Sequence, residues 1–209
     1  MIFNQIIGQE HIKNHLKVSA ENGRIPHAQL FIGKEGSGTL PMAIAYAQFL
    51  LCNFSENVDI CNLKCEKLQH PDLHFAYPVT SNEKIKKHPV SSLFLEDWRN
   101  FIATQPYGSL FNWLQHIGVE NKQGIIGVDE AEEVVKKLTL KSYEGGFKVM
   151  IIWMAEKMNI AAANPRKAAT LLKDLKAWRQ SVGAQMMTPN PAYDPNSAGG
   201  RRKAGKKKK

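Results

Sequence analysis

Three glycines, Gly33, Gly36 and Gly38, lie in the stretch LFIGKEGSGTLPMAIAYA, which covers residues 30–47. An apolar strand, a glycine-rich turn and a helix in this order form a phosphate-binding loop, because backbone N–H groups and the helix N-terminus then point at the phosphates. Such a loop continues with a lysine and a magnesium-binding Ser/Thr, but here these positions hold Thr39 and Leu40. The glycine pattern alone also fits a tight structural turn.

The elements around this loop follow from apolar periodicity and run lengths. Strands that alternate with helices predict an α/β fold with a parallel sheet flanked by helices. The continuous apolar run near residue 150 is typical of a central strand covered on both faces. The expected helices cover residues 9–22, 39–51 and 128–140, and the expected strands cover 28–32, 72–79 and 147–155.

The helix expected over residues 128–140 has Asp129 as its candidate N-cap. Its apolar residues Ala131, Val134, Val135 and Leu138 share one helical face. We expect that face to be the buried one.

Residues 80–124 are too long for a plain connection in such a sheet, so we expect an insertion there. A helical insertion that packs its own aromatic side chains is favoured over an exposed ligand surface. The aromatic residues are Phe94, Trp98, Phe101, Tyr107, Phe111 and Trp113.

The formal net charge of +9 comes from the end of the chain. Residues 165–209 hold 12 of the 28 Lys/Arg and only 2 of the 19 acids, so the body is near neutral. We expect an appended helix over 165–183 and a disordered basic tail over 184–209. The tail predicts weak, sequence-independent nucleic-acid binding at most. The helix carries an apolar stripe of Leu171, Leu172, Leu175, Trp178 and Val182.

The N-terminus lacks the pattern of a signal peptide, and no apolar run reaches the ~20 residues of a membrane helix. We therefore expect a cytoplasmic protein without a membrane partner. Three cysteines, Cys52, Cys61 and Cys65, are an odd number in a short stretch, which favours reduced thiols over a disulfide scaffold.

Six stretches resemble the bacterial DNA polymerase III clamp-loader subunits, specifically delta-prime, in a form associated with Bacteroidetes. The resemblance implies a partial AAA+ domain over residues 1–164. Family members join other clamp-loader subunits in a pentamer that opens the sliding clamp and places it on primed DNA. The stretches are FNQIIGQEHI, GRIPHAQLFIGKEGSG, HPDLHF, ENKQGIIGVDEAEEVVKKL, KSYEGGFKVMIIWMAEKMN and AAAN.

The resemblance also implies what the loop lacks. In the hydrolysing subunits the strand that corresponds to KVMIIW ends in the Asp-Glu pair of the Walker B motif, whereas this chain has Trp153 and Met154. We therefore expect a vestigial P-loop, no catalytic residues and no nucleotide cofactor. IIGQ, residues 6–9, matches the adenine-side motif and is expected to serve in packing. An ATP-binding clamp-loader subunit and a nucleic-acid-binding protein acting through the tail are the alternatives.

Related subunits often carry a zinc module with four cysteines, and closed zinc sites need four ligands. This chain offers Cys52, Cys61 and Cys65, and His70 is a candidate fourth ligand. HPD, residues 70–72, is better explained as a turn before a strand. We expect reduced cysteines in a local core, with bound zinc as the alternative.

The resemblance stops near Asn164, where the expected EEPP stretch and Ser-Arg-Cys motif do not follow. The next thirty or so residues resemble the end of arylsulfatase-type sulfatases, although the nucleophile motif Cys-x-Pro-Ser-Arg is absent. A fusion at Asn164 and Pro165 is favoured over a divergent C-terminal helix. The AAA+ domain would then be truncated, and its sheet would have an uncovered edge.

Overall fold

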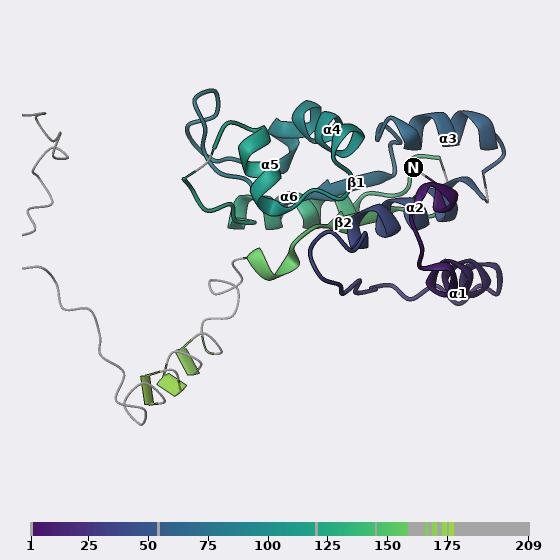
Figure 1. Ribbon diagram of the computed structural model, residues 1–209, viewed down its shortest axis with the longest axis horizontal. Helices are drawn as coiled ribbons and strands as arrows, with labels where there is room; N and C mark the ends of the chain where they lie inside the picture. Colours follow the sequence, from purple (N-terminus) through teal and green to yellow (C-terminus); the bar gives the residue numbers. More distant parts are fainter. Residues whose placement is uncertain are drawn as a thin grey trace, which may run out of the picture. The chain divides into compact units, whose positions relative to one another are not determined.

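The computed structural model describes residues 2–53, 55–119, 121–144 and 146–158, together with seven residues between Arg166 and Ala177. Contacts divide the chain into two units, residues 1–163 and 164–209. The first unit contains the sheet, the core and the glycine-rich loop (Figure 1).

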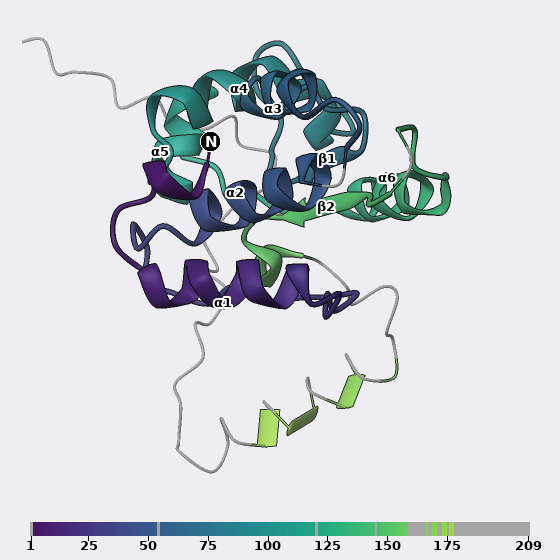
Figure 2. The ribbon, with the colours of Figure 1, turned by 90° about the vertical axis from the view of Figure 1, so that its right-hand side faces the viewer.

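The described helices are short and follow one another with few strands between them (Figures 1 and 2). The expected helices over 9–22, 39–51 and 128–140 are confirmed to within two residues. The α-helices are α1 (Glu10–Glu21), α2 (Thr39–Cys52), α3 (Val58–Glu66), α4 (Leu95–Thr104), α5 (Leu110–His116) and α6 (Val128–Thr139), and the 3-10 helices are η1 (Phe3–Gln5), η2 (Ser91–Phe94) and η3 (Ala155–Lys157).

The sheet pairs β1 (Leu73–Ala76) with β2 (Val149–Ile152) in parallel, with Leu73 opposite Val149 and Ala76 opposite Ile152. Two backbone hydrogen bonds extend the ladder at its ends: Val149 N–H donates to Asp72 C=O and Trp153 N–H donates to Ala76 C=O, both at 2.9 Å. Helices flank this pair, so the predicted α/β class with a parallel sheet is confirmed.

The prediction of a strand over residues 28–32 is wrong, because the structure assigns no strand there. Leu30 and Ile32 are 77% and 84% exposed. Among the described residues β2 pairs only with β1, so it is not the central strand that its apolar run predicts. An apolar run forms a strand only where another strand completes its hydrogen bonds, and residues 28–32 have no such partner in the described sheet.

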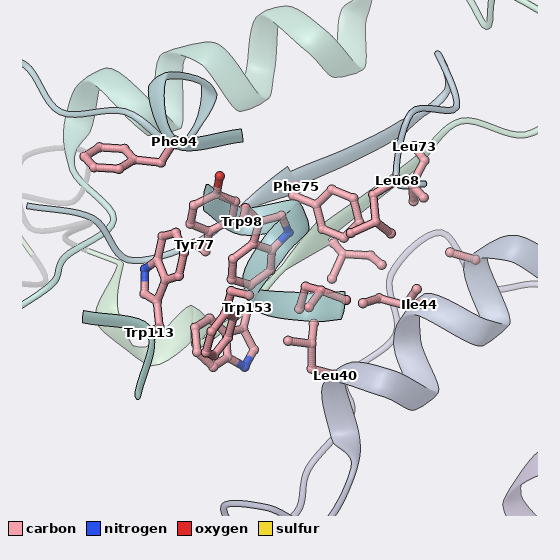
Figure 3. Packing of buried hydrophobic residues seen from close by; sticks show 14 of the residues in the cluster. Leu40, Ile44, Leu68, Leu73, Phe75, Tyr77, Phe94, Trp98, Trp113 and Trp153 are labelled. Carbon is pink, nitrogen blue, oxygen red and sulfur yellow. The ribbon is translucent and has the colours of Figure 1, made fainter. Parts of the chain in front are cut away.

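The main core is built from aromatic side chains that meet between the sheet and helices α4 and α5 (Figure 3). Tyr77 and Trp98 stack with ring centroids 3.9 Å apart, and Trp113 meets both rings edge-on at 5.2 Å. Such aromatic pairs add stabilisation beyond the area that they bury. The predicted helical insertion that packs its own aromatics is confirmed for Phe94, Trp98, Phe101 and Trp113, whereas Phe111 is 62% exposed.

Helix α2 contributes to two separate clusters of buried residues, which explains why it is apolar on most of its faces. Leu40, Ile44, Ala47 and Leu51 belong to the main core with β1 and β2. Met42, Tyr46 and other residues of α2 pack with Phe3, Ile6 and the buried residues of α1. The helix therefore connects the sheet to the N-terminal segment.

The face of α6 that is buried differs from the predicted one. Val135 and Leu138 are 62% and 50% exposed, whereas Val134 and Glu130 are buried. Glu130 can be buried because its carboxylate accepts hydrogen bonds from the backbone N–H and the hydroxyl of Ser91, both at 2.5 Å. The N-cap is Gly127, and Asp129 lies in the first turn, so the assignment of Asp129 as the cap is also wrong.

The second unit is described at seven positions only, all of them helical: Arg166, Ala169, Thr170, Lys173, Asp174, Lys176 and Ala177. The predicted apolar stripe on this helix and the basic tail over 184–209 lie outside the described residues.

Candidate functional site: the glycine-rich loop

The loop before α2 turns through two glycines with left-handed backbone. Gly36 has φ +76° and Gly38, the N-cap of α2, has φ +88°. The N–H of Ser37 donates to the C=O of Lys34 at 3.0 Å, which closes the turn. The loop thus leads into a helix N-terminus, as the sequence predicts.

The side chains of Ser37 and Thr39 lie close to Gly33. A Cβ on Gly33 would collide with the hydroxyl of Ser37 and would lie 2.7 Å from the methyl carbon of Thr39. The lack of a side chain at Gly33 therefore leaves room for these two side chains.

The two positions that follow the glycines do not offer the chemistry of a nucleotide site. Thr39 is half-buried, and Leu40 is 6% exposed and packs in the main core. A magnesium ligand at position 40 would need an oxygen facing the loop, and a side chain turned into an apolar core cannot supply one.

Trp153 and Met154, which the sequence resemblance places at the Walker B positions, also pack against the core. Trp153 is 7% exposed, and its ring centroid lies 5.4 Å from that of Trp98 (Figure 3). Met154 is half-buried, packs against the same cluster and has φ +57°, at the point where the chain leaves β2. An indole and a thioether at these two positions provide packing instead of a carboxylate pair.

Tyr107, in the turn between α4 and α5, lies against Gly38 at the end of the glycine-rich loop. Its ring atom Cε1 lies 2.9 Å from the position that a Cβ on Gly38 would take. Its hydroxyl accepts a hydrogen bond from the N–H of Ile7 at 3.1 Å, across 100 residues of sequence. The sequence identified Tyr107 only as an aromatic of the insertion, since no spacing pattern connects a residue to a partner so far away.

The IIGQ segment, residues 6–9, is held to the body by packing and hydrogen bonds. Ile6 is buried against α1 and α2, and its C=O accepts a hydrogen bond from the buried ammonium group of Lys13 at 2.6 Å. Gly8 and Gln9 both have positive φ and turn the chain into α1. These contacts agree with a role in packing.

Comparison with known proteins identifies the family. The family model described as "DNA polymerase III, delta subunit" matches residues 8–192. The chain belongs to this family. The resemblance to clamp-loader subunits that the six stretches carry is thereby confirmed, and the matched range continues past Asn164.

Curated relatives match shorter parts of the chain. The DNA polymerase III subunit delta' of Bacillus subtilis (strain 168) is 33% identical over 90 residues, which are 41% of this chain and 26% of that protein. The DNA polymerase III subunits gamma/tau of Mycobacterium bovis and Mycobacterium tuberculosis are each 38% identical over 64 residues, or 31% of this chain and 11% of theirs. The matches thus span about a quarter or less of these relatives. No solved structure matches the chain.

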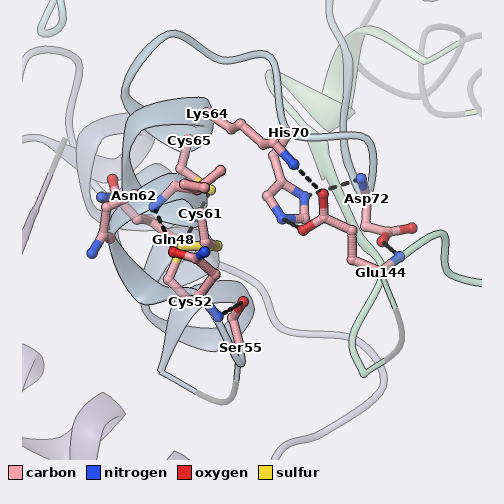
Figure 4. The surroundings of a disulfide bond; sticks show 12 residues. Gln48, Cys52, Ser55, Cys61, Asn62, Lys64, Cys65, His70, Asp72 and Glu144 are labelled. Atoms are coloured by element: carbon pink, nitrogen blue, oxygen red, sulfur yellow. Dashed lines mark hydrogen bonds and ion pairs between the residues drawn. A yellow bond between two sulfur atoms is a disulfide. The ribbon is translucent and has the colours of Figure 1, made fainter.

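The three cysteines of this DNA polymerase III delta-family chain lie together in the core, where α2 ends and α3 begins (Figure 4). Cys52 and Cys61 form a disulfide with Cα atoms 5.4 Å apart, and the Sγ of Cys65 lies 3.6 Å from that of Cys52. The expectation of reduced thiols is therefore wrong for two of the three. The short connection between α2 and α3 brings the Cα atoms within bonding range, which the odd cysteine count does not reveal.

The donor set around these sulfurs does not match a closed zinc site. All three Sγ atoms lie within 4.8 Å of one another, but tetrahedral zinc needs a fourth ligand and two of the sulfurs are bonded together. His70 uses both ring nitrogens elsewhere: Nδ1 accepts the Asp72 N–H at 3.1 Å and Nε2 lies 3.1 Å from the Glu144 carboxylate. Burial raises the pKa of the Cys65 thiol to about 11.

The polar residues beside the cysteines connect the loop after α6 to the start of the sheet. The carboxylate of Asp72 accepts the backbone N–H groups of Tyr143 and Glu144, the closest at 2.8 Å. A hydrogen bond from Lys64, together with the nearby His70, lowers the pKa of Glu144 (Figure 4). This network therefore has a structural role.

A separate surface hollow of about 370 Å³ lies along α6. Two of its three acids are paired with neighbouring bases, with His88 Nδ1 2.8 Å from Asp129 and Lys137 3.2 Å from Glu133. None of its lining residues belongs to the glycine loop; they are His88, Val90, Asp129, Glu132, Glu133 and Lys136.

Within the described residues, none of the helices has the length and apolar character required to cross a membrane.

Proposed function

We propose that this chain is a non-catalytic, delta-prime-type subunit of the DNA polymerase III clamp loader, with an AAA+ domain that acts in DNA replication through contacts with other subunits. The proposal rests on the residues that stand at the four positions needed for hydrolysis. Thr39 stands where the phosphate lysine belongs, and Leu40, Trp153 and Met154 pack against or within the apolar core.

Phosphoryl transfer depends on positioning and on charge stabilisation of the transferred group. Without the lysine, nothing in the motif neutralises the γ-phosphate. Without a hydroxyl at position 40 and a carboxylate at position 153, nothing in the motif holds magnesium, and without an acid at position 154 nothing polarises the attacking water.

As a clamp-loader subunit, the chain would act in the cytoplasm with the other subunits of the complex. Through that complex it would meet the sliding clamp and primed DNA. Family membership and the similarity to a delta' subunit and to gamma/tau subunits support these partners.

An ATP-binding clamp-loader subunit is the second candidate. The similarity to two gamma/tau subunits over 64 residues favours it, as do the left-handed glycines that keep the loop in a turn before α2. A loop that binds ATP without cleaving it would satisfy both observations. Binding and turnover must therefore be measured separately.

The direct test is steady-state ATP hydrolysis by the purified chain, with binding of a fluorescent ATP analogue measured in parallel. We expect neither above background. Thr39→Lys restores the phosphate lysine, and we expect it to remain inactive because the two acids are still missing. Turnover by the unaltered chain that is lost in a Gly38→Val variant would contradict the proposal, and binding without turnover would favour the second candidate.

Assembly is tested by mixing the chain with the other purified clamp-loader subunits and running size-exclusion chromatography. Specific interfaces generally bury more than about 1,000 Å² in total. Co-elution at micromolar concentration would support the contacts with other subunits that the proposal requires, and its absence would contradict them.

A further inference from the structure

Tyr107 brings together three segments that are far apart in the sequence. Its ring lies on Gly38 at the start of α2, its hydroxyl accepts the N–H of Ile7, and its backbone belongs to the turn between α4 and α5. We propose that Gly38 and the Ile7 N–H form a socket for a planar ring that carries a hydrogen-bond acceptor at its edge, and that Tyr107 occupies this socket from within the chain. This inference rests on the proposed function, in which the loop holds no nucleotide.

One side of the socket is the bare Cα of Gly38. A side chain at this position would point at the ring, with its Cβ only 2.9 Å from Cε1 and 3.6 Å from Cδ1 of Tyr107. Real Cβ atoms keep a larger distance from neighbouring carbons, so any residue except glycine would displace the ring. Gly36 is the contrast, because a Cβ there would meet no atom within 4 Å.

The other side of the socket is a backbone donor. The Ile7 side chain is 83% exposed, so packing of that side chain does not hold Ile7 itself. The N–H of Ile7 donates a hydrogen bond to the Tyr107 hydroxyl at 3.1 Å. In this structure the acceptor is a hydroxyl at the edge of an aromatic ring.

Tyr107 is itself held in place by the residue that follows it. A Cβ on Gly108 would lie 2.6 Å from Cζ of Phe101, so the turn passes directly over a buried ring of α4. The Gly108 N–H also donates to the Gln105 C=O at 2.9 Å. The ring is therefore presented to the loop by the aromatic core.

Tyr107 thus covers Gly38 at the start of α2 and binds the N–H of Ile7. Another planar ring could enter this socket only by displacing the tyrosine ring. These contacts join the N-terminal segment, α2 and the insertion.

The first experiment measures amide hydrogen exchange of Ile7 by NMR in the full chain. Tyr107→Phe keeps the ring and removes the acceptor, and we expect exchange at Ile7 to accelerate about fivefold, since a hydrogen bond of this kind contributes roughly 1 kcal/mol. The matched control is Tyr143→Phe, which removes a hydroxyl from a side chain that is 83% exposed. Unchanged exchange at Ile7 in Tyr107→Phe would overturn the proposal.

The second experiment restores the ring from solution. Tyr107→Gly empties the socket, and p-cresol supplies the missing ring and hydroxyl, whereas toluene supplies the ring alone. We expect p-cresol at millimolar concentration to restore Ile7 protection saturably in Tyr107→Gly and not in the unaltered chain, with toluene restoring little. Failure of p-cresol to protect Ile7 in a folded Tyr107→Gly variant would overturn the socket, and if that variant does not fold, Tyr107→Phe decides alone.

The two proposals fail in different ways. ATP turnover by the unaltered chain with Ile7 still protected would overturn the non-catalytic function and leave the socket intact. An Ile7 amide that exchanges as fast in the unaltered chain as in Tyr107→Phe, without any ATP turnover, would overturn the socket alone.

Discussion

Replacing Gly38 by alanine should cost more stability than the same change at Gly36, and the difference isolates the contact with Tyr107. Both glycines have left-handed backbone, with φ +88° and +76°. An alanine in this conformation costs about 1–2 kcal/mol at either site. The two variants therefore share the backbone cost and differ in what the new methyl group meets.

At Gly36 the methyl enters open space, whereas at Gly38 it lies 2.9 Å from Cε1 of Tyr107. The ring must therefore shift to make room for the methyl group. Displacing the ring stretches or breaks the hydrogen bond with Ile7, which is worth about 1 kcal/mol. We expect Gly38→Ala to be less stable than Gly36→Ala by about this amount.

The assay is urea unfolding of the full chain followed by tryptophan fluorescence, for both single variants and for each combined with Tyr107→Ala. Without the tyrosine ring, the extra cost at Gly38 should vanish, giving a coupling energy of about 1 kcal/mol between residues 38 and 107. Equal stabilities of Gly38→Ala and Gly36→Ala, or a difference that persists in the Tyr107→Ala background, would refute this reasoning.

Three further predictions concern other parts of the chain. Glu130→Ala leaves the buried N–H of Ser91 without its acceptor and should lower the free energy of unfolding in urea by about 3 kcal/mol. Glu132 is exposed, so Glu132→Ala should lower it by less than about 0.5 kcal/mol. Similar losses for the two variants would contradict the assigned role of Glu130. Burial raises the pKa of Cys65 from 9.0 to about 11, so the thiol of the unfolded chain ionises first as pH rises. The contribution of this group to stability should therefore be lost between about pH 9 and pH 11. A Cys65→Ala variant whose stability has the same pH dependence as the unaltered chain would refute this. Deleting residues 201–209, which hold 7 basic residues, should abolish any salt-sensitive DNA binding, and binding that survives both the deletion and high salt would indicate a site on the body.

Helices α1, α2 and α6 were predictable, because their apolar spacing and end signals are local, whereas α3 was not predicted. Helix α2 is apolar around its circumference and is buried on both sides, as its sequence indicates. The strands were less predictable. The apolar run over 28–32 has the composition of a strand, but a strand also requires hydrogen bonds from residues distant in the chain, and the described sheet supplies none to that segment.

The errors at α6 and at the cysteines have a similar cause. A carboxylate at position 130 appears solvent-exposed on a helical wheel, and only the approach of Ser91 from η2 makes its burial favourable. Likewise, an odd number of cysteines says nothing about which Cα atoms the α2–α3 connection brings within 5.4 Å. In both cases the deciding neighbour is set by tertiary structure.

The glycine-rich loop shows why a motif can persist in a sequence without indicating its ligand. In a nucleotide-binding loop, glycines are required because the backbone approaches phosphates closely. Here the lack of a side chain at Gly33 leaves room for Ser37 and Thr39, and at Gly38 for the ring of Tyr107. Glycines at this spacing can thus meet a packing constraint as well as a ligand constraint. The two cases differ in the side chains that accompany the glycines, and in this chain Leu40 and Trp153 are apolar and packed in the core.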